Sequence, residues 1–350
     1  MNLQNPKKFK MLVDQAHEVA LNVLRPISRK YDKAEHAYPK ELDMLAALVD
    51  GMNQAGDGMN AGAAVNKRGD TSTGNKNGVN MSTALSIVEM CYGDTGLLLS
   101  MPRQGLGNSA IAAVANEEQL QRFNGVWAAM AITEPNCGSD SAAIRTTATK
   151  VDNEYILNGE KIFVTSGDRA DAVVVWATLD KKLGRAAIKS FVVTKGTPGM
   201  TVERLEHKLG IKASDTATIR FENCRVPASN LLGNAEIDIA KGFAGVMETF
   251  DNTRPLVAAM AVGCAKAALE RIKEIFKDQL DTNYATPCLQ CSHIAAQIYR
   301  MEAEWEAARL LMLKAAWMAD NKQPNSREAS ISKAKAGRVC VMKSHSNASS

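Results

Sequence analysis

The sequence has 350 residues, of which 45% are hydrophobic and 23% charged, values typical of globular proteins and not of disordered or collagen-like chains. Its 42 Lys and Arg against 38 Asp and Glu give a formal net charge of +4, and this small surplus, with no long run of like charges, argues against nucleic-acid binding. No stretch approaches the ~18–20 apolar residues of a membrane span. Met1–Lys10 lacks the apolar core of a signal peptide, so we expect a cytoplasmic protein.

The cysteines argue against both a disulfide framework and a zinc site. There are 7 of them, an odd number in a long chain, so a disulfide scaffold is not expected. Cys288 and Cys291, followed by His293, are the only close pair. A zinc site needs two further ligands at comparable spacing, and none is visible. We therefore predict an incidental, reduced pair and no metal site.

The first third of the chain has the apolar periodicity of helices. One helix face is formed by Phe9, Leu12, Ala16, Val19 and Val23, a pattern that Pro26 interrupts. A second helix is predicted near residues 41–52. Residues 51–80 are rich in Gly, Asn and Asp and predict a long loop. Helical patterns resume over residues 81–123.

The middle third has the pattern of strands. Asn158-Gly159 between two apolar runs, 155–157 and 160–164, predicts a hairpin, because Asn-Gly tolerates the positive φ of a two-residue turn. Further strands are predicted over 173–176, 191–193 and 218–221, with turns at Pro198-Gly199 and Val226-Pro227. The pattern over residues ~126–235 therefore predicts a small all-β domain.

The last third is again helical and has the pattern of a bundle. Leu269, Ile272 and Phe276 share one face, and a longer stripe is formed by Ile294, Ile298, Met301, Trp305, Ala308, Met312 and Ala315. The sequence thus predicts an α+β fold of three parts. These are an N-terminal helical domain (1–125), a middle β-barrel or sandwich domain (126–238) and a C-terminal helical bundle (239–350).

Two polar segments are candidates for chemistry. Met130–Asp140 combines hydroxyl groups with Gly138, where the backbone could approach an anion or an aromatic ring edge, although an ordinary polar turn explains such a loop more often. Asp251–Pro255 brings an acid, an amide, a hydroxyl and a guanidinium group together in one turn. A binding site and a solvated turn with an internal Asp–Arg pair explain that second segment equally well.

Taken together, several blocks resemble the flavin-dependent acyl-CoA dehydrogenases. They follow the family's order from about residue 10 to 338 and include Ala131–Pro135, Gly138–Asp140, Leu157–Gly167, Leu209–Thr216, Arg225–Pro227 and Asp251–Pro255. The resemblance implies the same order of three domains and the oxidation of an acyl-CoA thioester to the trans-2-enoyl-CoA. It implies hydride transfer to FAD, electron transfer to an electron-transfer flavoprotein, and a homodimer or homotetramer.

The resemblance also implies roles for individual residues. Those similar to the residues that line the flavin or cover its ring are Met130, Ile132, Thr133, Gly138, Ser139, Phe163, Val164 and Thr165. Those similar to substrate-contacting residues are Ser139, Asp251, Asn252, Thr253 and Arg254.

The chain departs from the family at the catalytic base. The family carries a Glu either in a loop near its C-terminus or on the helix at the position of Thr253, and threonine cannot act as that base near neutral pH. Glu248 lies ~140° around the helix from that position and should not substitute. We therefore name no catalytic residue and expect the sequence to lack the segment with the Glu. The alternative is a non-catalytic flavin and acyl-CoA binding protein or a truncated family member.

A second departure concerns the FAD pyrophosphate. The family usually carries an Arg, which helps to hold that group, near the position of Asp281 in this sequence. A carboxylate beside a pyrophosphate would be repulsive. We therefore expect that contact to be absent or replaced.

Overall fold

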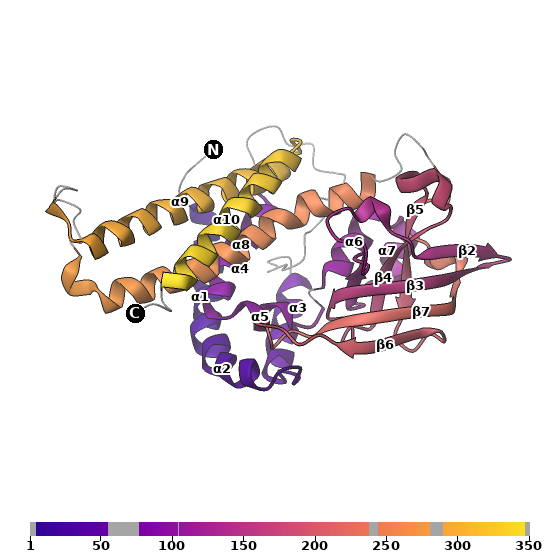
Figure 1. Cartoon of the computed structure of the whole chain (residues 1–350), viewed down its shortest axis with the longest axis horizontal. Helices are drawn as coiled ribbons and strands as arrows, with labels where there is room; N and C mark the ends of the chain where they lie inside the picture. Colours follow the sequence, from indigo (N-terminus) through magenta and orange to yellow (C-terminus); the bar gives the residue numbers. More distant parts are fainter. Residues whose placement is uncertain (1–4, 55–76, 104, 238–243, 281–289, 347–350) are drawn as a thin grey trace. The chain divides into compact units, whose positions relative to one another are not determined.

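The structure is a computed structural model that describes residues 5–54, 77–103, 105–237, 244–280 and 290–346. The chain divides into two compact units (Figure 1), each described by itself below. The first unit comprises Met1–Ile27, Asn66–Thr95 and Asp251–Ser350, and the second comprises Ser28–Val65 and Gly96–Phe250. Helices flank a middle region of strands in sequence, so the predicted α+β class is confirmed. The division into three domains at 125/126 and 238/239 stays a prediction.

The first unit is built from helices. They are α1 (Lys10–Val19), α4 (Val79–Gly93), α8 (Ala244–Ile275, whose residues from Asp251 belong to this unit), α9 (His293–Asp320) and α10 (Ser326–Ser346). Figure 1 shows α9 and α10 side by side. Among the described residues, no helix has both the length and the apolar character needed to cross a membrane.

Pro26 interrupts the first helical pattern only locally. A π-helical turn over Ala20–Leu24 follows α1, and α2 (Arg25–Lys33) continues directly from it. The N–H of Arg25 donates to the carbonyl of Ala20, five residues back in place of the usual four. Because proline lacks an N–H and its ring crowds the preceding turn, the wider turn gives the ring room. The helix therefore runs past the predicted interruption to Lys33.

The predicted apolar stripe of the last third packs in the core of the first unit. Leu269 and Ile272 of α8 and Ile298 of α9 are buried together, and half-buried neighbours pack against them, namely Phe276, Leu280, Ile294, Met301 and Trp305. The indole Nε1 of Trp305 donates to the carbonyl of Val262 at 3.0 Å, which satisfies its polar atom. The interpretation of this stripe as core is confirmed.

The second unit contains short helices and a curled sheet (Figure 1). Its helices are α3 (Glu41–Gln54), α5 (Thr95–Leu99, which begins in the first unit), α6 (Leu106–Val114) and α7 (Glu117–Arg122). Its strands are β1 (Ala128–Ala131), β2 (Thr147–Val151), β3 (Glu154–Thr165), β4 (Ala172–Thr178), β5 (Ile188–Thr194), β6 (Met200–Leu205) and β7 (Thr216–Pro227).

The sheet has the strand order β1-β4-β2-β3-β7-β6, and β5 also pairs with β4. Strand β4 pairs in parallel with β1 and β2, whereas the other pairs are antiparallel. Every residue of β4 is buried, because apolar clusters cover it on both faces. Phe191 and Phe221 are buried on one side of the sheet, and Ile111 of α6 packs on the other. The strand predictions over 173–176, 191–193 and 218–221 are confirmed.

The predicted hairpin at Asn158-Gly159 is wrong. Glu154–Thr165 forms one continuous strand, and the hairpin turn is Asp152-Asn153, between β2 and β3. Asp152 has the positive φ, 53°, that such a turn needs. Gly159 lies where β3 shifts register against β7, and a Cβ on it would stand 2.4 Å from Thr146 Oγ1. The close approach of Thr146, rather than a turn, requires glycine there.

The two predicted proline turns have different outcomes. Pro198-Gly199 lies in the turn before β6, as predicted, and Gly199 has a φ of 86°. Val226-Pro227 instead forms the end of β7. Proline is tolerated at the end of a strand because no further ladder bond is needed from its nitrogen.

Candidate functional site

The end of β1 and the second half of β3 lie next to each other in the second unit. The N–H of Ile162 donates to the carbonyl of Thr133 at 2.9 Å, and Lys161 Nζ donates to the carbonyl of Ile132 at 3.1 Å. These bonds join two segments that the sequence analysis singled out separately. The structure therefore brings the predicted flavin-contacting groups around 130–133 and 163–165 together where the end of β1 meets the second half of β3.

A buried ion pair fixes this junction. Lys161 is 0% exposed and lies 2.8 Å from Oε1 of Glu134, which is 6% exposed. Glu134 also accepts hydrogen bonds from the backbone N–H groups of Arg145 and Thr146 and from the Thr146 hydroxyl, at 2.6, 2.9 and 2.5 Å. Burial alone would raise the pKa of Glu134, but Lys161 and these donors hold it below its usual value. The carboxylate therefore stays ionised and ties three chain segments together.

Glu134 and Lys161 lie in segments that resemble the family, but the sequence alone assigned neither of them a role. They lie 27 positions apart, and neither a strand pattern nor a polar loop pattern predicts that two charged residues are buried against each other. The signal that could have found them is a Lys among the apolar residues of a predicted strand, since a lysine in the core needs a partner.

Phe163 stands in a strained bulge at this junction. The pairing of β3 with β7 shifts register between Lys161 and Val164, so the residues between them leave the regular ladder. Phe163 has a φ of 57°, which is rare for a bulky residue, and its side chain is 61% exposed. A strained backbone that holds a large aromatic ring outward indicates a ligand-facing position.

Two of the predicted flavin-contacting residues point into the core instead. Ile132 and Val164 are buried in the apolar clusters on the two sides of the sheet. Only their main-chain groups are therefore available to a ligand. Met130 is half-buried and packs against the same cluster as Ile132.

The predicted polar contacts are accessible. Thr133 and Thr165 are half-buried and Ser139 is exposed, and no hydrogen bond from their hydroxyls to another described residue is formed. Gly138 is exposed, and a Cβ there would meet only Thr133 Cγ2, at the ordinary distance of 3.7 Å. These three hydroxyl groups can therefore donate to or accept from a ligand without losing an existing bond.

The predicted substrate-contacting residues lie on α8 in the first unit. Arg254 Nη1 lies 3.1 Å from Asp251 Oδ1, and both side chains are half-buried. Thr253 is buried at 5% exposure. The helix continues through Pro255, so this proline lies in the helix interior and removes one hydrogen bond there. Nothing about the side chains of Asn252 and Glu248 is described, and Asp281 and Cys288 lie outside the described residues.

Two sequence-family models match the chain. The model described as acyl-CoA dehydrogenase, middle domain, covers residues 129–224. The model described as acyl-CoA dehydrogenase, C-terminal domain, covers residues 240–346. The first match includes the junction of β1 and β3, and the second includes the Asp251–Arg254 turn.

Relatives match over nearly the whole chain. The mouse mitochondrial short-chain specific acyl-CoA dehydrogenase is 30% identical over 98% of this chain and 80% of that protein. The acryloyl-CoA reductase (NADH) of Anaerotignum propionicum is 31% identical over 95% of this chain and 82% of that protein. The solved structure of butyryl-CoA dehydrogenase from Megasphaera elsdenii has a TM-score of 0.83 at 30% identity, and covers 99% of this chain and 88% of that chain.

The groups where β1 meets β3 fit the FAD of this family. An isoalloxazine ring is a flat aromatic system with hydrogen-bonding edges. The exposed ring of Phe163 offers it an apolar face, and the hydroxyls of Thr133, Ser139 and Thr165 offer polar contacts that no other described residue uses. The donor set is neutral and suits such a ring.

Replacing Phe163 tests this fit. We expect Phe163→Ala to weaken FAD retention by about 10-fold, since stacking of an aromatic ring on a planar heterocycle contributes ~1–3 kcal/mol. The melting temperature of the FAD-free protein should change little, because the ring is 61% exposed. Equilibrium dialysis of FAD measures the effect, with Leu183→Ala, an exposed apolar residue of the same unit, as the control. Equal FAD affinity in all three proteins would show that Phe163 does not face the flavin.

Both family models and the relatives that match nearly the whole chain lead to one assignment. The chain belongs to the acyl-CoA dehydrogenase family of FAD-dependent oxidoreductases.

Proposed function

We propose that the protein oxidises a short-chain acyl-CoA thioester to the trans-2-enoyl-CoA and passes the electrons to an electron-transfer flavoprotein. The observation that carries the proposal is the outward-held Phe163 where β1 meets β3, with the hydroxyls of Thr133, Ser139 and Thr165, which no other described residue binds. The short-chain substrate is supported by relatives named as short-chain specific acyl-CoA dehydrogenase and butyryl-CoA dehydrogenase. A chain from a structural study of the electron transferring flavoprotein of Acidaminococcus fermentans, with a TM-score of 0.80 at 30% identity, supports the electron acceptor.

The chain's own residues would bind and orient the reactants. FAD, when bound, supplies the acceptor for the β hydride. Phe163 would cover one face of the ring and exclude water there, and the hydroxyls of Thr133 and Thr165 would hold its polar edge. Hydrogen bonds to the thioester carbonyl in a dry site would make the α carbon more acidic. Arg254 would place a positive charge near the phosphates of CoA.

The group that accepts the α proton is not assigned. Thr253 occupies the helix position at which the resemblance puts the base of some members, and it is buried and carries no acidic group. Asp251, two residues earlier, is paired with Arg254. A homodimer or homotetramer and a cytoplasmic location are also proposals, and light scattering of the purified protein tests the first.

The decisive experiment is anaerobic addition of butyryl-CoA to the FAD-loaded protein. We expect the oxidised-flavin absorption band to bleach and one equivalent of trans-2-enoyl-CoA to form, more slowly than with a positioned base, which contributes ~10²–10⁴-fold and is not assigned in this sequence. A spectral shift without bleaching would mean that the protein binds acyl-CoA but does not oxidise it, and would favour the binding-protein alternative. A panel of longer acyl-CoAs measures the chain-length preference, and faster bleaching by a long chain would contradict the short-chain assignment.

Reduction of an acryloyl thioester is a second candidate function. It is favoured by the 31% identity to an acryloyl-CoA reductase (NADH) over 95% of this chain. Mixing the chemically reduced flavoprotein with acryloyl-CoA separates the two directions. Rapid flavin reoxidation with propionyl-CoA as product, combined with no bleaching by propionyl-CoA or butyryl-CoA, would favour the reductase.

Arg254 is expected to act in acyl-CoA binding rather than in FAD binding. Loss of a charge-assisted contact costs ~1.5–3 kcal/mol, so Arg254→Ala should weaken butyryl-CoA binding by ~10–150-fold and leave FAD content unchanged. Arg271→Ala is the matched control, because Arg271 forms the same i,i+3 pair with Glu274 on the same helix. Equal losses of FAD and acyl-CoA in the Arg254 variant would instead point to a structural role for the Asp251–Arg254 turn.

A further inference from the structure

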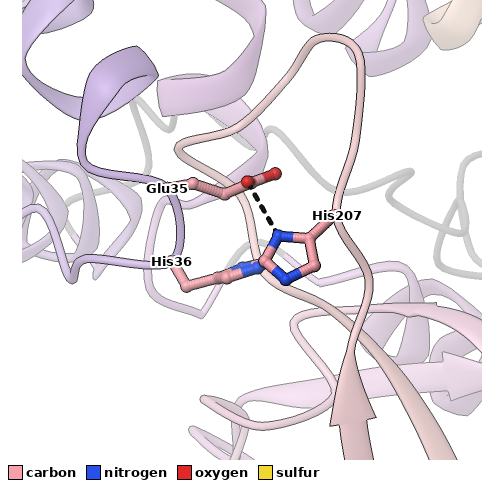
Figure 2. Close-up of side chains that lie close together, drawn as sticks. All are labelled: Glu35, His36 and His207. Carbon is pink, nitrogen blue, oxygen red and sulfur yellow. Dashed lines mark hydrogen bonds and ion pairs between the residues drawn. The ribbon is translucent and has the colours of Figure 1, made fainter.

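Three side chains of metal-binding type converge in the second unit, in a part of the molecule that the proposed function does not use. Glu35 and His36 lie in the turn after α2, and His207 lies two residues after β6. Figure 2 shows the three side chains pointing toward one another from these two segments. A potential ligand atom of each lies within 4.8 Å of those of the other two. No local sequence pattern indicates this cluster, because 172 positions separate Glu35 from His207.

Contacts within the chain already hold the cluster together. Glu35 Oε2 accepts from His207 Nδ1 at 3.0 Å, and Glu35 Oε1 accepts from the N–H of Lys208 at 2.9 Å. The N–H of His36 donates to the carbonyl of Lys212 at 3.4 Å, and Arg169 Nη2 donates to the carbonyl of His36 at 3.1 Å. The two segments are thus positioned before any ion binds, which reduces the ordering cost of binding.

His36 has an unusual backbone conformation and an unusual side-chain environment. Its backbone has a φ of 68°, and both ring nitrogens are buried without a hydrogen-bond partner among the described residues. A neutral imidazole carries one N–H donor and one acceptor nitrogen, so leaving both unpaired away from water is costly. Its ring centroid lies 5.4 Å from that of His207. A ligand that bonds to one of these nitrogens would remove part of this cost.

We propose that Glu35, His36 and His207 form a binding site for a divalent transition-metal ion of the zinc type. Two imidazoles and one carboxylate suit Zn²⁺, Co²⁺, Ni²⁺ or Cu²⁺, whereas Ca²⁺ and Mg²⁺ prefer oxygen ligands. On ion binding, neutral His207 would carry its one ring proton on Nε2, which leaves the Nδ1 lone pair for the ion without a net loss of protons. His207 is 86% exposed, so water can fill the remaining coordination positions.

The groups around the cluster favour an ionised Glu35, and one of them, Lys212, opposes the binding of a cation. Glu35 accepts hydrogen bonds from His207 and from the N–H of Lys208, and both donors favour the ionised carboxylate that a cation binds. The ammonium of Lys208 is occupied by the carbonyl of Ser214 and by the hydroxyl of Thr216. The positive charge of Lys212 acts on Glu35 directly. Replacing Lys212 should therefore strengthen the binding of a cation.

The test is a Co²⁺ titration of chelator-treated, FAD-loaded protein, followed by calorimetry and by the visible Co²⁺ bands. We expect saturable binding of one equivalent without a thiolate charge-transfer band. His207→Ala and Glu35→Gln should weaken binding by at least ~10-fold, because loss of even an outer partner of a metal ligand costs ~10–100-fold. Lys212→Met should strengthen binding, and His293→Ala, which removes an exposed histidine of α9, should leave it unchanged. Zn²⁺ should raise the melting temperature of the unmodified chain and not that of the His207 variant.

Three results would overturn the proposal. They are the absence of saturable Co²⁺ binding, equal affinity in the unmodified and His207→Ala proteins, and a thiolate charge-transfer band that places the ion on a cysteine such as Cys291. Because the His207 side chain is exposed, the His207→Ala protein should fold, and an unchanged FAD content confirms this before the titration is compared.

Discussion

Lys161→Met is expected to destabilise the second unit by ~3–5 kcal/mol, the cost of removing one partner from a buried ion pair. Glu134 would stay buried at 6% exposure with its carboxylate charge uncompensated. Urea unfolding followed by circular dichroism measures the change. Arg225→Met is the matched control on the neighbouring strand, because Arg225 forms an exposed pair with Glu154 at 3.1 Å and should cost less than ~1 kcal/mol. Equal effects of the two substitutions would show that the buried pair contributes no more than the surface pair.

The pH dependence of this variant should be opposite to that of the unmodified chain. In the unmodified chain the pKa of Glu134 is lowered by Lys161 and the neighbouring donors. A lowered carboxyl pKa contributes stability that is present above the unfolded value of ~4.3 and is lost as pH falls through the folded value. Without Lys161, burial raises the pKa of Glu134, and that contribution is present below ~4.3 and lost as pH rises through the folded value. The deficit of Lys161→Met should therefore be larger at neutral pH than near pH ~4.

The double variant Lys161→Met, Glu134→Leu separates the charge from the packing. Replacing both members of a buried pair by apolar residues is often close to neutral for stability. We therefore expect the double variant to be more stable than Lys161→Met alone. FAD retention should nevertheless fall in the double variant, because the carboxylate of Glu134 also holds the N–H groups of Arg145 and Thr146. Retention equal to that of the unmodified chain would show that this network does not position the flavin edge.

The helical parts of the fold could be predicted from the sequence because their signal is local and long. The stripe from Ile294 to Ala315 repeats over many turns, and packing in the bundle needs only that one face. Pro26 was a weaker indicator of a helix end, because a π-helical turn over Ala20–Leu24 lets the helix continue past it. The class and order of the elements were therefore predictable, and their interruptions were not.

The strand boundaries depended on contacts that no local pattern contains. Asn158-Gly159 has the sequence of a hairpin turn, yet Asn158 Oδ1 accepts from the N–H of Asn223 on β7 at 2.8 Å, and Gly159 makes room for Thr146. Asn223 lies in β7, and Thr146 directly precedes β2. The choice between a turn at 158–159 and a turn at Asp152-Asn153 was thus decided by tertiary packing, against the higher local turn propensity of Asn-Gly.

The sequence predicted which segments form the candidate site but not how they are arranged in space. The blocks around Thr133 and Phe163 carried the resemblance, and the structure brings them together. The bulge that holds Phe163 outward arises from the register of β3 against β7, which cannot be read from β3 alone. The same holds for Glu35 and His207, whose proximity follows from the turn after α2 meeting the segment after β6.

Asp320→Ala is expected to destabilise the first unit by ~2–4 kcal/mol, because Asp320 caps a helix far away in the sequence. Its carboxylate accepts from the N–H of Gly78 at 2.7 Å, of Asn80 at 2.9 Å and of Met81 at 3.0 Å. These are the first N–H groups of α4, and the N-cap residue Gly78 has no side chain to satisfy them. The negative charge also complements the positive end of the helix dipole.

The burial of this contact makes it stronger than an ordinary cap. Asp320 is 5% exposed, and α4 is buried from Asn80 to Cys91, so water cannot replace the lost acceptor easily. Asn116→Ala, at the local N-cap of α7, should cost only ~0.5–2 kcal/mol. Asp320→Asn keeps an acceptor without the charge and should fall between the two. Gly78→Ala should resemble Asp320→Ala, since a Cβ there would lie 2.9 Å from Asp320 Oδ1 and push the carboxylate away.

Hydrogen exchange localises the effect within the first unit. If Asp320 caps α4, the amides of Gly78, Asn80 and Met81 should lose protection first in Asp320→Ala, ahead of those in the middle of the helix. Uniform loss of protection across α4, α8 and α9 would mean instead that the substitution damages bundle packing in general. A cap supplied from 242 positions away couples the start of α4 to the end of α9, so these two ends should unfold together rather than fray independently.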